Sequence, residues 1–156
     1  AMACMLDGKH VSWLPSYGPE MRGGTANCSV IVSDEDVASP MVDKADAIVA
    51  MNLPSLDKFE NKVRPGGVLV INSSIIERKS TRDDITVVYC DAMKIAEDVG
   101  NPKGANVAIL GALMEKMPIV SVDKMMEAIR IELGERKLRF LEGNKKALVA
   151  GMEAAK

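Results

Sequence analysis

The stretch SYGPEMRGGTANC, residues 16–28, separates two strand-like runs of this sequence. The runs are Lys9–Leu14 before it and Asn27–Ser33 after it, and both contain β-branched or bulky apolar residues. Pro19 fixes one φ angle, and the pair Gly23-Gly24 permits backbone angles that other residues avoid. The stretch therefore predicts a shaped loop between two strands.

The same loop carries groups that suit an anionic ligand. Adjacent glycines let a ligand approach main-chain N–H groups, and Arg22 beside them is a planar, permanently charged donor for phosphate or carboxylate. Trp13 and Tyr17 flank the loop in a chain with only 3% aromatic residues, which favours a binding loop. The alternative is a plain tight connection with a solvated arginine, because turns are what glycine pairs usually mark.

Three later runs are short and apolar throughout, which is typical of strands buried on both faces of a parallel sheet. Segments with helical spacing alternate with these runs. We therefore predict an α/β fold, a three-layer Rossmann-like domain with a mostly parallel sheet, helices on both faces and a C-terminal helical tail. The predicted strands of this sheet are Val11–Leu14, Ala47–Met51, Val68–Ile71 and Thr86–Cys90.

Apolar spacing and stop signals predict the remaining elements. Capping residues, glycines and prolines place helices at 55–63, 92–99, 106–117, 122–133 and 135–155. The pair Gly143-Asn144 is a candidate interruption of the last helix. The charged run 77–84 predicts a solvated excursion between two strands.

Polar and glycine residues follow the predicted strands at their carboxyl ends. These are the loop Ser16–Thr25, then Asn52, Asn72 and Asp91. Ligands of open parallel sheets bind outside these ends, so the predicted binding edge is this one. The alternative for each asparagine is that it only caps the next helix or turn.

Length and charge limit the class of protein. At 156 residues the chain predicts one domain over 1–156, and 47% hydrophobic residues support a core. The chain has 20 Lys and Arg residues against 22 Asp and Glu residues, so it has no excess of positive charge that would indicate nucleic-acid binding. No apolar run is long enough to span a membrane, so we expect no membrane partner.

The reactive side chains form no recognisable catalytic or metal set. Cys4, Cys28 and Cys90 lie too far apart in sequence for iron–sulfur or zinc spacing, and the lone His10 lies in a strand-like run. An odd number of scattered thiols favours a reducing cytoplasm over a disulfide framework. The residues by themselves therefore predict no catalytic role and no metal.

Residues 15–28, PSYGPEMRGGTANC, resemble the signature of the gamma subunit, or gamma domain, of 2-oxoacid:ferredoxin oxidoreductases. Two further stretches, residues 51–59 and 64–74, fit the same family. A fourth stretch, residues 106–111 leading to 118–121, agrees with the family pattern in order and spacing. The resemblance covers nearly the whole chain. In the family a strand and a glycine-rich turn precede the first helix, and this sequence has neither, so we expect part of any nucleotide site to lie outside it.

The resemblance implies a role inside a larger enzyme. Members decarboxylate a 2-oxoacid on thiamine diphosphate, pass electrons through iron–sulfur clusters to ferredoxin and form an acyl-CoA. Thiamine diphosphate and the clusters are expected on alpha, beta and ferredoxin-like delta subunits, and this chain alone is expected to bind none of them. The gamma unit packs beside the active site and helps to hold coenzyme A. The implied candidates for the coenzyme A side or the subunit seam are Ser16, Tyr17, Gly18, Arg22, Gly23, Gly24 and Thr25, with Asn52 and Asn72 as further candidates.

Two other classes of function remain open at this point. One is a structural assembly subunit whose loop docks on alpha and beta and binds no ligand. The other is a free-standing nucleotide-dependent dehydrogenase, which no acid or base beside the loop supports. The substrate is expected to be 2-oxoglutarate or a branched-chain 2-oxoacid, with pyruvate open, and indolepyruvate oxidoreductases share the domain.

Overall fold

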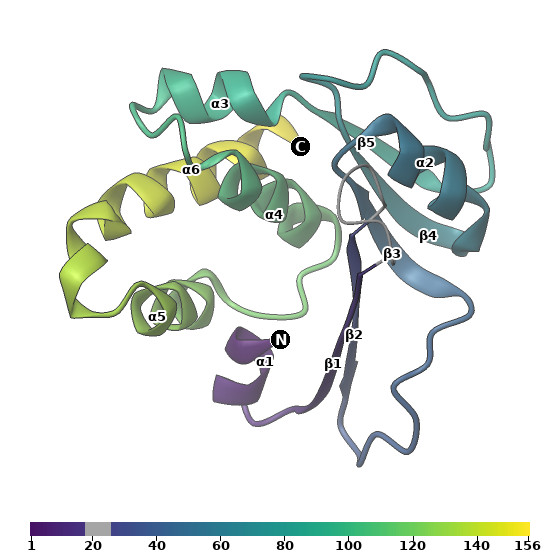
Figure 1. Ribbon diagram of the computed structural model, residues 1–156, viewed down its shortest axis with the longest axis horizontal. Coiled ribbons are helices and arrows are strands. Elements are labelled where there is room, and N and C mark those ends of the chain that lie inside the picture. The colour runs from purple at the N-terminus through teal and green to yellow at the C-terminus, as the bar shows by residue number, and fades with distance from the viewer. Residues whose placement is uncertain (18–25) are drawn as a thin grey trace. The chain divides into compact units, whose positions relative to one another are not determined.

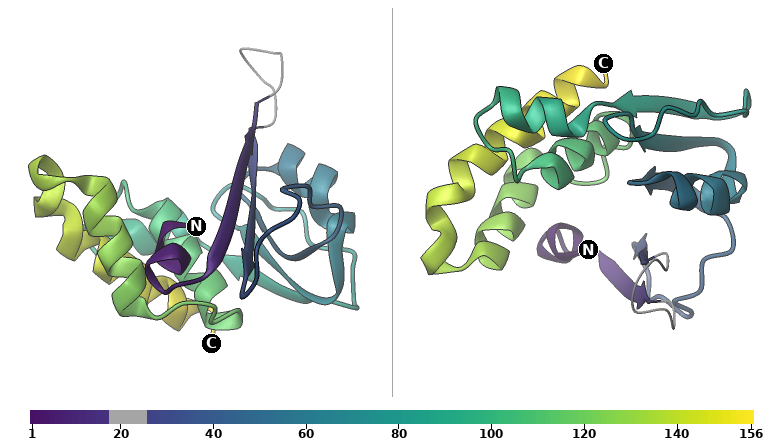
Figure 2. Two further views of the ribbon diagram at one scale, coloured as in Figure 1. Left: turned by 90° about the horizontal axis from the view of Figure 1, so that it is seen from below. Right: turned by 45° about the horizontal axis from the view of Figure 1, so that its top comes forward.

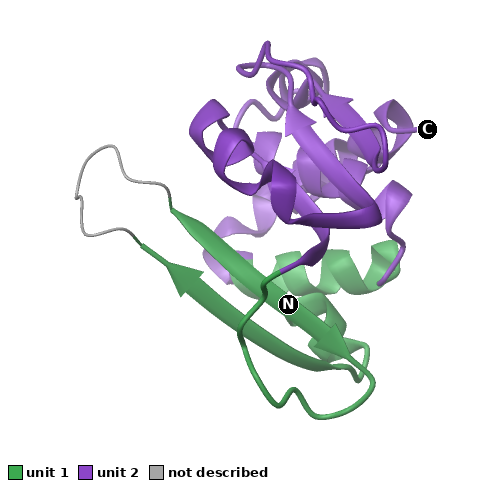
Figure 3. Cartoon of the chain, turned by 90° about the vertical axis from the view of Figure 1, so that its right-hand side faces the viewer, with its two compact units in different colours: residues 1–43, 120–132 green, residues 44–119, 133–156 purple. Residues whose placement is uncertain are grey.

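The computed structural model describes residues 1–17 and 26–156 (Figure 1). The chain divides into two compact units, which Figure 3 shows in separate colours. Unit 1 comprises residues 1–43 and 120–132, and unit 2 comprises residues 44–119 and 133–156. The prediction of one domain over 1–156 stays a prediction.

Unit 2 contains the parallel sheet. Its strands are β3 (Ala45–Ala50), β4 (Val63–Asn72) and β5 (Thr86–Cys90), in the order β3-β4-β5. Ile71 of β4 pairs with Ala50 on one side and with Tyr89 on the other. The continuous apolar runs thus correctly predicted three parallel strands.

Helices cover both faces of this sheet, as predicted. Alternate residues of a strand point to opposite faces, so Leu69 and Ile71 share one face and Val68 and Val70 the other. On the first face, Leu56 of α2 (Leu53–Phe59) joins Leu69 and Ile71 in one buried cluster. Helix α4 (Ala105–Lys116) contacts all three strands and lies on the opposite side from α2 (Figures 1 and 2). The predicted α/β fold with a C-terminal helix is therefore confirmed.

The connection from β4 to β5 contains no helix, although a parallel pair needs a crossover. Residues Ser73–Ile85 instead form a strap, in which Ile76 is buried with the α2-side cluster and Ile85 packs against it. The chain therefore uses an irregular segment where most such folds place a helix.

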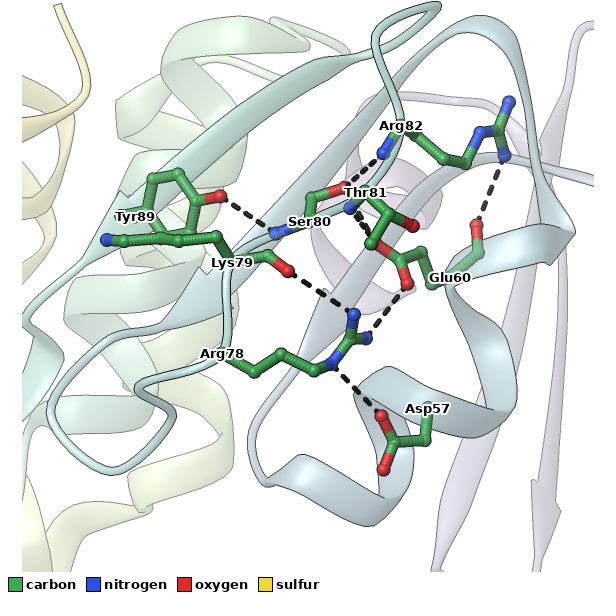
Figure 4. A network of polar contacts seen from close by, with 8 residues as sticks. All are labelled: Asp57, Glu60, Arg78, Lys79, Ser80, Thr81, Arg82 and Tyr89. Carbon is green, nitrogen blue, oxygen red and sulfur yellow. Dashed lines mark hydrogen bonds and ion pairs between the residues drawn. The ribbon is translucent and has the colours of Figure 1, made fainter.

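A buried carboxylate holds the strap (Figure 4). Glu60 lies in the short 3₁₀ turn η1 (Glu60–Lys62), and it is only 5% exposed. Its Oε1 accepts from Ser80 Oγ at 2.6 Å and from the Thr81 N–H at 3.1 Å, and its Oε2 lies 2.8 Å from Arg78 Nη2. Arg82 Nη1 donates to the carbonyls of Glu60 and Val63 at 3.2 and 2.6 Å. The prediction that this charged run is only a solvated excursion is therefore wrong, because its polar groups satisfy a buried acid.

The remaining helices of unit 2 pack on one another (Figures 1 and 2). They are α3 (Ala92–Asp98) and α6 (Leu141–Ala154), with the 3₁₀ segment η2 (Glu135–Phe140) before α6. Helix α6 runs through Gly143-Asn144 without a break. Helices α4 and α6 cross at two glycines: a Cβ at Gly111 would lie 2.1 Å from the Leu148 carbonyl oxygen, and one at Gly151 would lie 1.9 Å from that of Ala108. Only glycine permits this close approach.

Unit 1 contains an antiparallel ribbon. Helix α1 (Met2–Leu6) leads to β1 (His10–Ser16), which pairs with β2 (Asn27–Ser33). Helix α5 (Val122–Leu133) follows a capping Ser121, whose Oγ accepts from the Lys124 N–H at 3.2 Å. The prediction that Val11–Leu14 belongs to the parallel sheet is wrong. Polar and apolar residues alternate over residues 10–13 of β1, and such alternation is typical of an antiparallel strand.

Candidate functional site

Most of the predicted coenzyme residues fall outside the described part of the chain. These are Gly18, Arg22, Gly23, Gly24 and Thr25. Ser16 is the last residue of β1, and Tyr17 follows it with 78% of its surface exposed. Both are open to solvent in unit 1, and their role stays a prediction.

The structure changes one argument for this loop. The loop was expected at the carboxyl edge because β1 was expected in the parallel sheet, and β1 instead pairs with β2 in unit 1, so membership of that sheet no longer supports this placement. What still favours ligand binding is its own chemistry, a glycine pair beside an arginine.

Asn52 and Asn72 do lie at the carboxyl edge, after the neighbouring strands β3 and β4. Asn52 is the N-cap of α2, and its Oδ1 accepts from the Ser55 N–H at 3.0 Å. The capping alternative for this residue is therefore observed. A contact between Asn52 and coenzyme A stays a prediction.

Asn72 belongs to a polar chain that joins the end of β4 to the start of α3. It is 3% exposed, and its Oδ1 accepts from the Ser74 N–H at 3.3 Å. Ser74 Oγ donates to Asp91 Oδ1 at 2.7 Å and accepts from the Met93 N–H at 2.9 Å. Asp91 Oδ1 also accepts from the Lys94 N–H at 3.3 Å as the N-cap of α3. The side-chain oxygens of this edge are thus committed largely to local turns and caps.

Exposed apolar side chains also follow the strand ends at this edge, a feature that the sequence analysis did not predict. They follow the same three strands: Met51 and Leu53 after β3, Ile75 after β4 and Met93 after β5. The sequence does contain a signal for these four residues. Each lies within a few residues of a strand end, and those strand ends were predicted to share one edge of the sheet. The edge thus combines exposed apolar side chains with a hydroxyl and a carboxylate, which suits uncharged parts of a ligand better than phosphate.

The Cys90 thiol, in the last residue of β5, is not set up for chemistry. Burial, with a smaller contribution from Asp91, raises the pKa of the Cys90 thiol to about 11, so this thiol stays protonated at neutral pH. Among residues 1–17 and 26–156, no three His, Cys, Asp or Glu side chains lie close enough together to hold a metal. The expectation that the chain binds no metal stays a prediction. No helix in the described part of the chain is long and apolar enough to cross a membrane.

The Glu60 cluster is polar and buried, but its geometry is that of a structural clamp. Burial would raise the pKa of the Glu60 carboxyl, yet hydrogen bonds from Ser80, Arg78 and Thr81 outweigh it and hold the pKa below its ordinary value. A carboxylate whose two oxygens are both bonded is a poor general base.

Comparisons with known proteins point to a single family. The family model described as "Pyruvate ferredoxin/flavodoxin oxidoreductase" matches residues 1–154. The chain is 37% identical over 158 residues to ketoisovalerate oxidoreductase subunit VorA of Methanothermobacter marburgensis, covering all of this chain and 32% of that protein. The chain thus spans about a third of the length of that curated relative.

Two solved structures share the fold. The keto/oxoacid ferredoxin oxidoreductase gamma subunit from Geobacter sulfurreducens PCA has a TM-score of 0.82 and 30% identity, over 99% of this chain and 86% of that one. The 2-oxoglutarate:ferredoxin oxidoreductase from Magnetococcus marinus, solved with 2-oxoglutarate, coenzyme A and succinyl-CoA bound, has a TM-score of 0.86 and 22% identity. There the match covers 99% of this chain and 27% of the other.

Proposed function

The chain belongs to the pyruvate ferredoxin/flavodoxin oxidoreductase family, and we propose that it is the gamma component of a 2-oxoacid:ferredoxin oxidoreductase. The observation that carries this proposal is the family match over residues 1–154. The proposed complex decarboxylates a 2-oxoacid, passes the electrons to ferredoxin and forms an acyl-CoA. Its alpha, beta and delta subunits supply thiamine diphosphate and the iron–sulfur clusters.

The proposed substrate is a branched-chain 2-oxoacid or 2-oxoglutarate. The first is supported by the name of the VorA relative, ketoisovalerate oxidoreductase. The proposed location is the cytoplasm, which the three free thiols Cys4, Cys28 and Cys90 support.

Within the complex, this chain is proposed to contribute to coenzyme A binding through its signature loop. Arg22 supplies a fixed positive fork for a phosphate group, and Gly23-Gly24 let main-chain N–H groups face it. Ser16, Tyr17, Gly18 and Thr25 belong to the same stretch and are proposed to line that contact. A structure of this fold has been solved with coenzyme A bound, which is compatible with the proposal.

The test is the substitution Arg22→Ala in the assembled complex. Loss of one charge-assisted phosphate contact costs about 1.5–3 kcal/mol, so the KM for coenzyme A should rise roughly ten- to a hundredfold. The KM for the 2-oxoacid should not change. A matched control is Arg136→Ala, which removes an exposed arginine from η2.

A structural assembly subunit is the second candidate function. It is favoured by the capping geometry of Asn52, Asn72 and Asp91, whose side-chain oxygens already serve the protein's own backbone or Ser74. If Arg22→Ala leaves coenzyme A kinetics unchanged and the complex instead dissociates, Arg22 is a subunit-seam residue. The structural function then replaces the ligand-binding one.

A further inference from the structure

The ribbon of unit 1 has one face made only of apolar residues. Directly opposed residues of an antiparallel pair share a face, and the register pairs Val11 with Val32, Trp13 with Val30 and Pro15 with Cys28. We call these six residues the apolar ribbon face. The other face carries mainly polar residues, among them His10, Ser12 and Ser29.

The centre of the apolar ribbon face is open to solvent. Trp13 is 59% exposed and Val30 beside it is 42% exposed, and Cys28 is also exposed. Val11, Pro15 and Val32 are half-buried, and no residue of β1 or β2 is fully buried. A two-stranded ribbon is only marginally stable by itself, and it becomes stable when a further strand or element covers its apolar face. Exposed, contiguous apolar surface of this kind marks an interaction site.

The strands have few of the features that keep edge strands apart from other chains. Neither His10–Ser16 nor Asn27–Ser33 contains Asp, Glu, Lys or Arg, and Pro15 is the one proline in these two strands. Both strands are edges, because β1 and β2 pair only with each other in the described part of unit 1. The ribbon therefore suits a partner surface that is apolar and uncharged.

The relatives indicate what covers it. The domain makes up 32% of VorA and 27% of the Magnetococcus chain, but 86% of the Geobacter gamma subunit. The same fold thus occurs fused to a much longer polypeptide and as a nearly complete separate subunit. A separate subunit must keep by surface contact the association that fusion secures covalently.

We propose that the apolar ribbon face is the surface on which this chain docks to the part of the oxidoreductase that corresponds to the remainder of the longer relatives. This inference rests on the proposed function. The partner presents an uncharged apolar patch, and Trp13 inserts into it as the anchor, since tryptophan is among the residues enriched at the energetic centres of interfaces.

The test compares two single substitutions of equally exposed aliphatic residues. Val30→Glu places a charge on the apolar ribbon face, and Leu14→Glu places one on the opposite face of the same ribbon. Val30 and Leu14 are 42% and 39% exposed, so neither change disturbs a buried site. The other subunits of the proposed complex, produced together without this chain, serve as the probe.

Val30→Glu should weaken binding to these subunits at least about tenfold, because a carboxylate would be buried without a partner, whereas Leu14→Glu should bind like the wild type. The exposed Cys28 thiol lies on the same face and gives a second readout. Its labelling by a maleimide should be fast in the free chain and at least tenfold slower in the wild-type complex. Circular dichroism and the Tm of both variants show that they fold.

Three results would overturn the proposal. The first is that Val30→Glu binds the subunits as tightly as the wild type does. The second is that Cys28 is labelled as fast in the complex as in the free chain. A stable dimer of the free chain that Val30→Glu dissociates, with the complex unaffected, assigns the face to a second copy instead. Failure of the wild-type chain to bind the subunits at all refutes the proposed function itself, so the two failures are distinguishable.

Discussion

Glu60 shows how one residue determines the path of an irregular segment. Its carboxylate is buried at the end of α2 and accepts from Ser80 and Thr81, with Arg78 at 2.8 Å. Arg78 Nε also lies 3.1 Å from Asp57 Oδ1, and Tyr89 Oη accepts from the Ser80 N–H at 3.0 Å. A buried acid that accepts several hydrogen bonds stabilises the fold more than an exposed ion pair does, because loss of the acid leaves its donors unpaired.

Replacing this residue should therefore destabilise the protein. We expect Glu60→Gln to lower the free energy of unfolding by about 1.5–3 kcal/mol, the range for hydrogen bonds to charged groups. Urea unfolding followed by circular dichroism measures this. Glu77→Gln, an exposed acid of the same strap, is the matched control and should change stability by less than about 0.5 kcal/mol. Equal effects from the two substitutions would contradict the clamp.

The same carboxylate predicts a pH dependence. The folded pKa of Glu60 lies below its ordinary value of 4.5, so the unfolded state takes up its proton first as the pH falls. The stabilisation is therefore complete at neutral pH and is lost as the pH falls below 4.5 through the folded pKa. The difference in unfolding free energy between wild type and Glu60→Gln should shrink when measured at successively lower pH. A difference that grows towards acid pH would exclude this assignment.

At the scale of the element, the crossing of α4 and α6 depends on the absence of two side chains. The contacts that a Cβ would make at Gly111 or Gly151 are with backbone atoms, which cannot rotate away. At Gly143, also in α6, the nearest atom to a Cβ is a side-chain atom of Asn101 at 3.4 Å, an ordinary contact.

This contrast gives opposite expectations for the same substitution. Gly111→Ala should cost about 1–3 kcal/mol through overpacking, or roughly 2–10 °C in Tm. Gly143→Ala should be neutral or stabilising by up to about 1 kcal/mol, because alanine favours a helix over glycine. Thermal unfolding of the two variants measures both. A stabilised Gly111→Ala would show that the helices are further apart than described.

The elements of unit 2 could be predicted because each was indicated by the residues of its own segment. Continuous apolar runs indicated β3, β4 and β5, and Asn52 with Pro54 indicated the start of α2. The ribbon was misplaced because a strand-like run does not say with which strand it pairs. The strap was misread because Arg78 and Arg82 look solvated until the buried Glu60, far away in sequence, is known.

At the scale of the whole molecule, the family and the fold class could be predicted, but only part of the candidate site. The signature of residues 15–28 and the glycine and proline stretch 64–74 are long enough to identify the family. The structure was needed to show that the side chains of Asn52 and Asp91 are hydrogen-bonded as helix caps, because a polar residue after a strand has the same sequence signal whether it caps a helix or binds a ligand. The apolar ribbon face required the strand register, which sets which residues share a side.

The proposed function makes this chain a necessary component of a 2-oxoacid:ferredoxin oxidoreductase. The most direct measurement is the rate of coenzyme A-dependent ferredoxin reduction by a 2-oxoacid, with three samples: the chain alone, the other subunits alone, and the two together. We expect the chain alone to be inactive and the full coenzyme A-dependent rate to appear only when both are present. A chain that oxidises the 2-oxoacid by itself, or a complex that keeps its full rate without the chain, would contradict the proposed function.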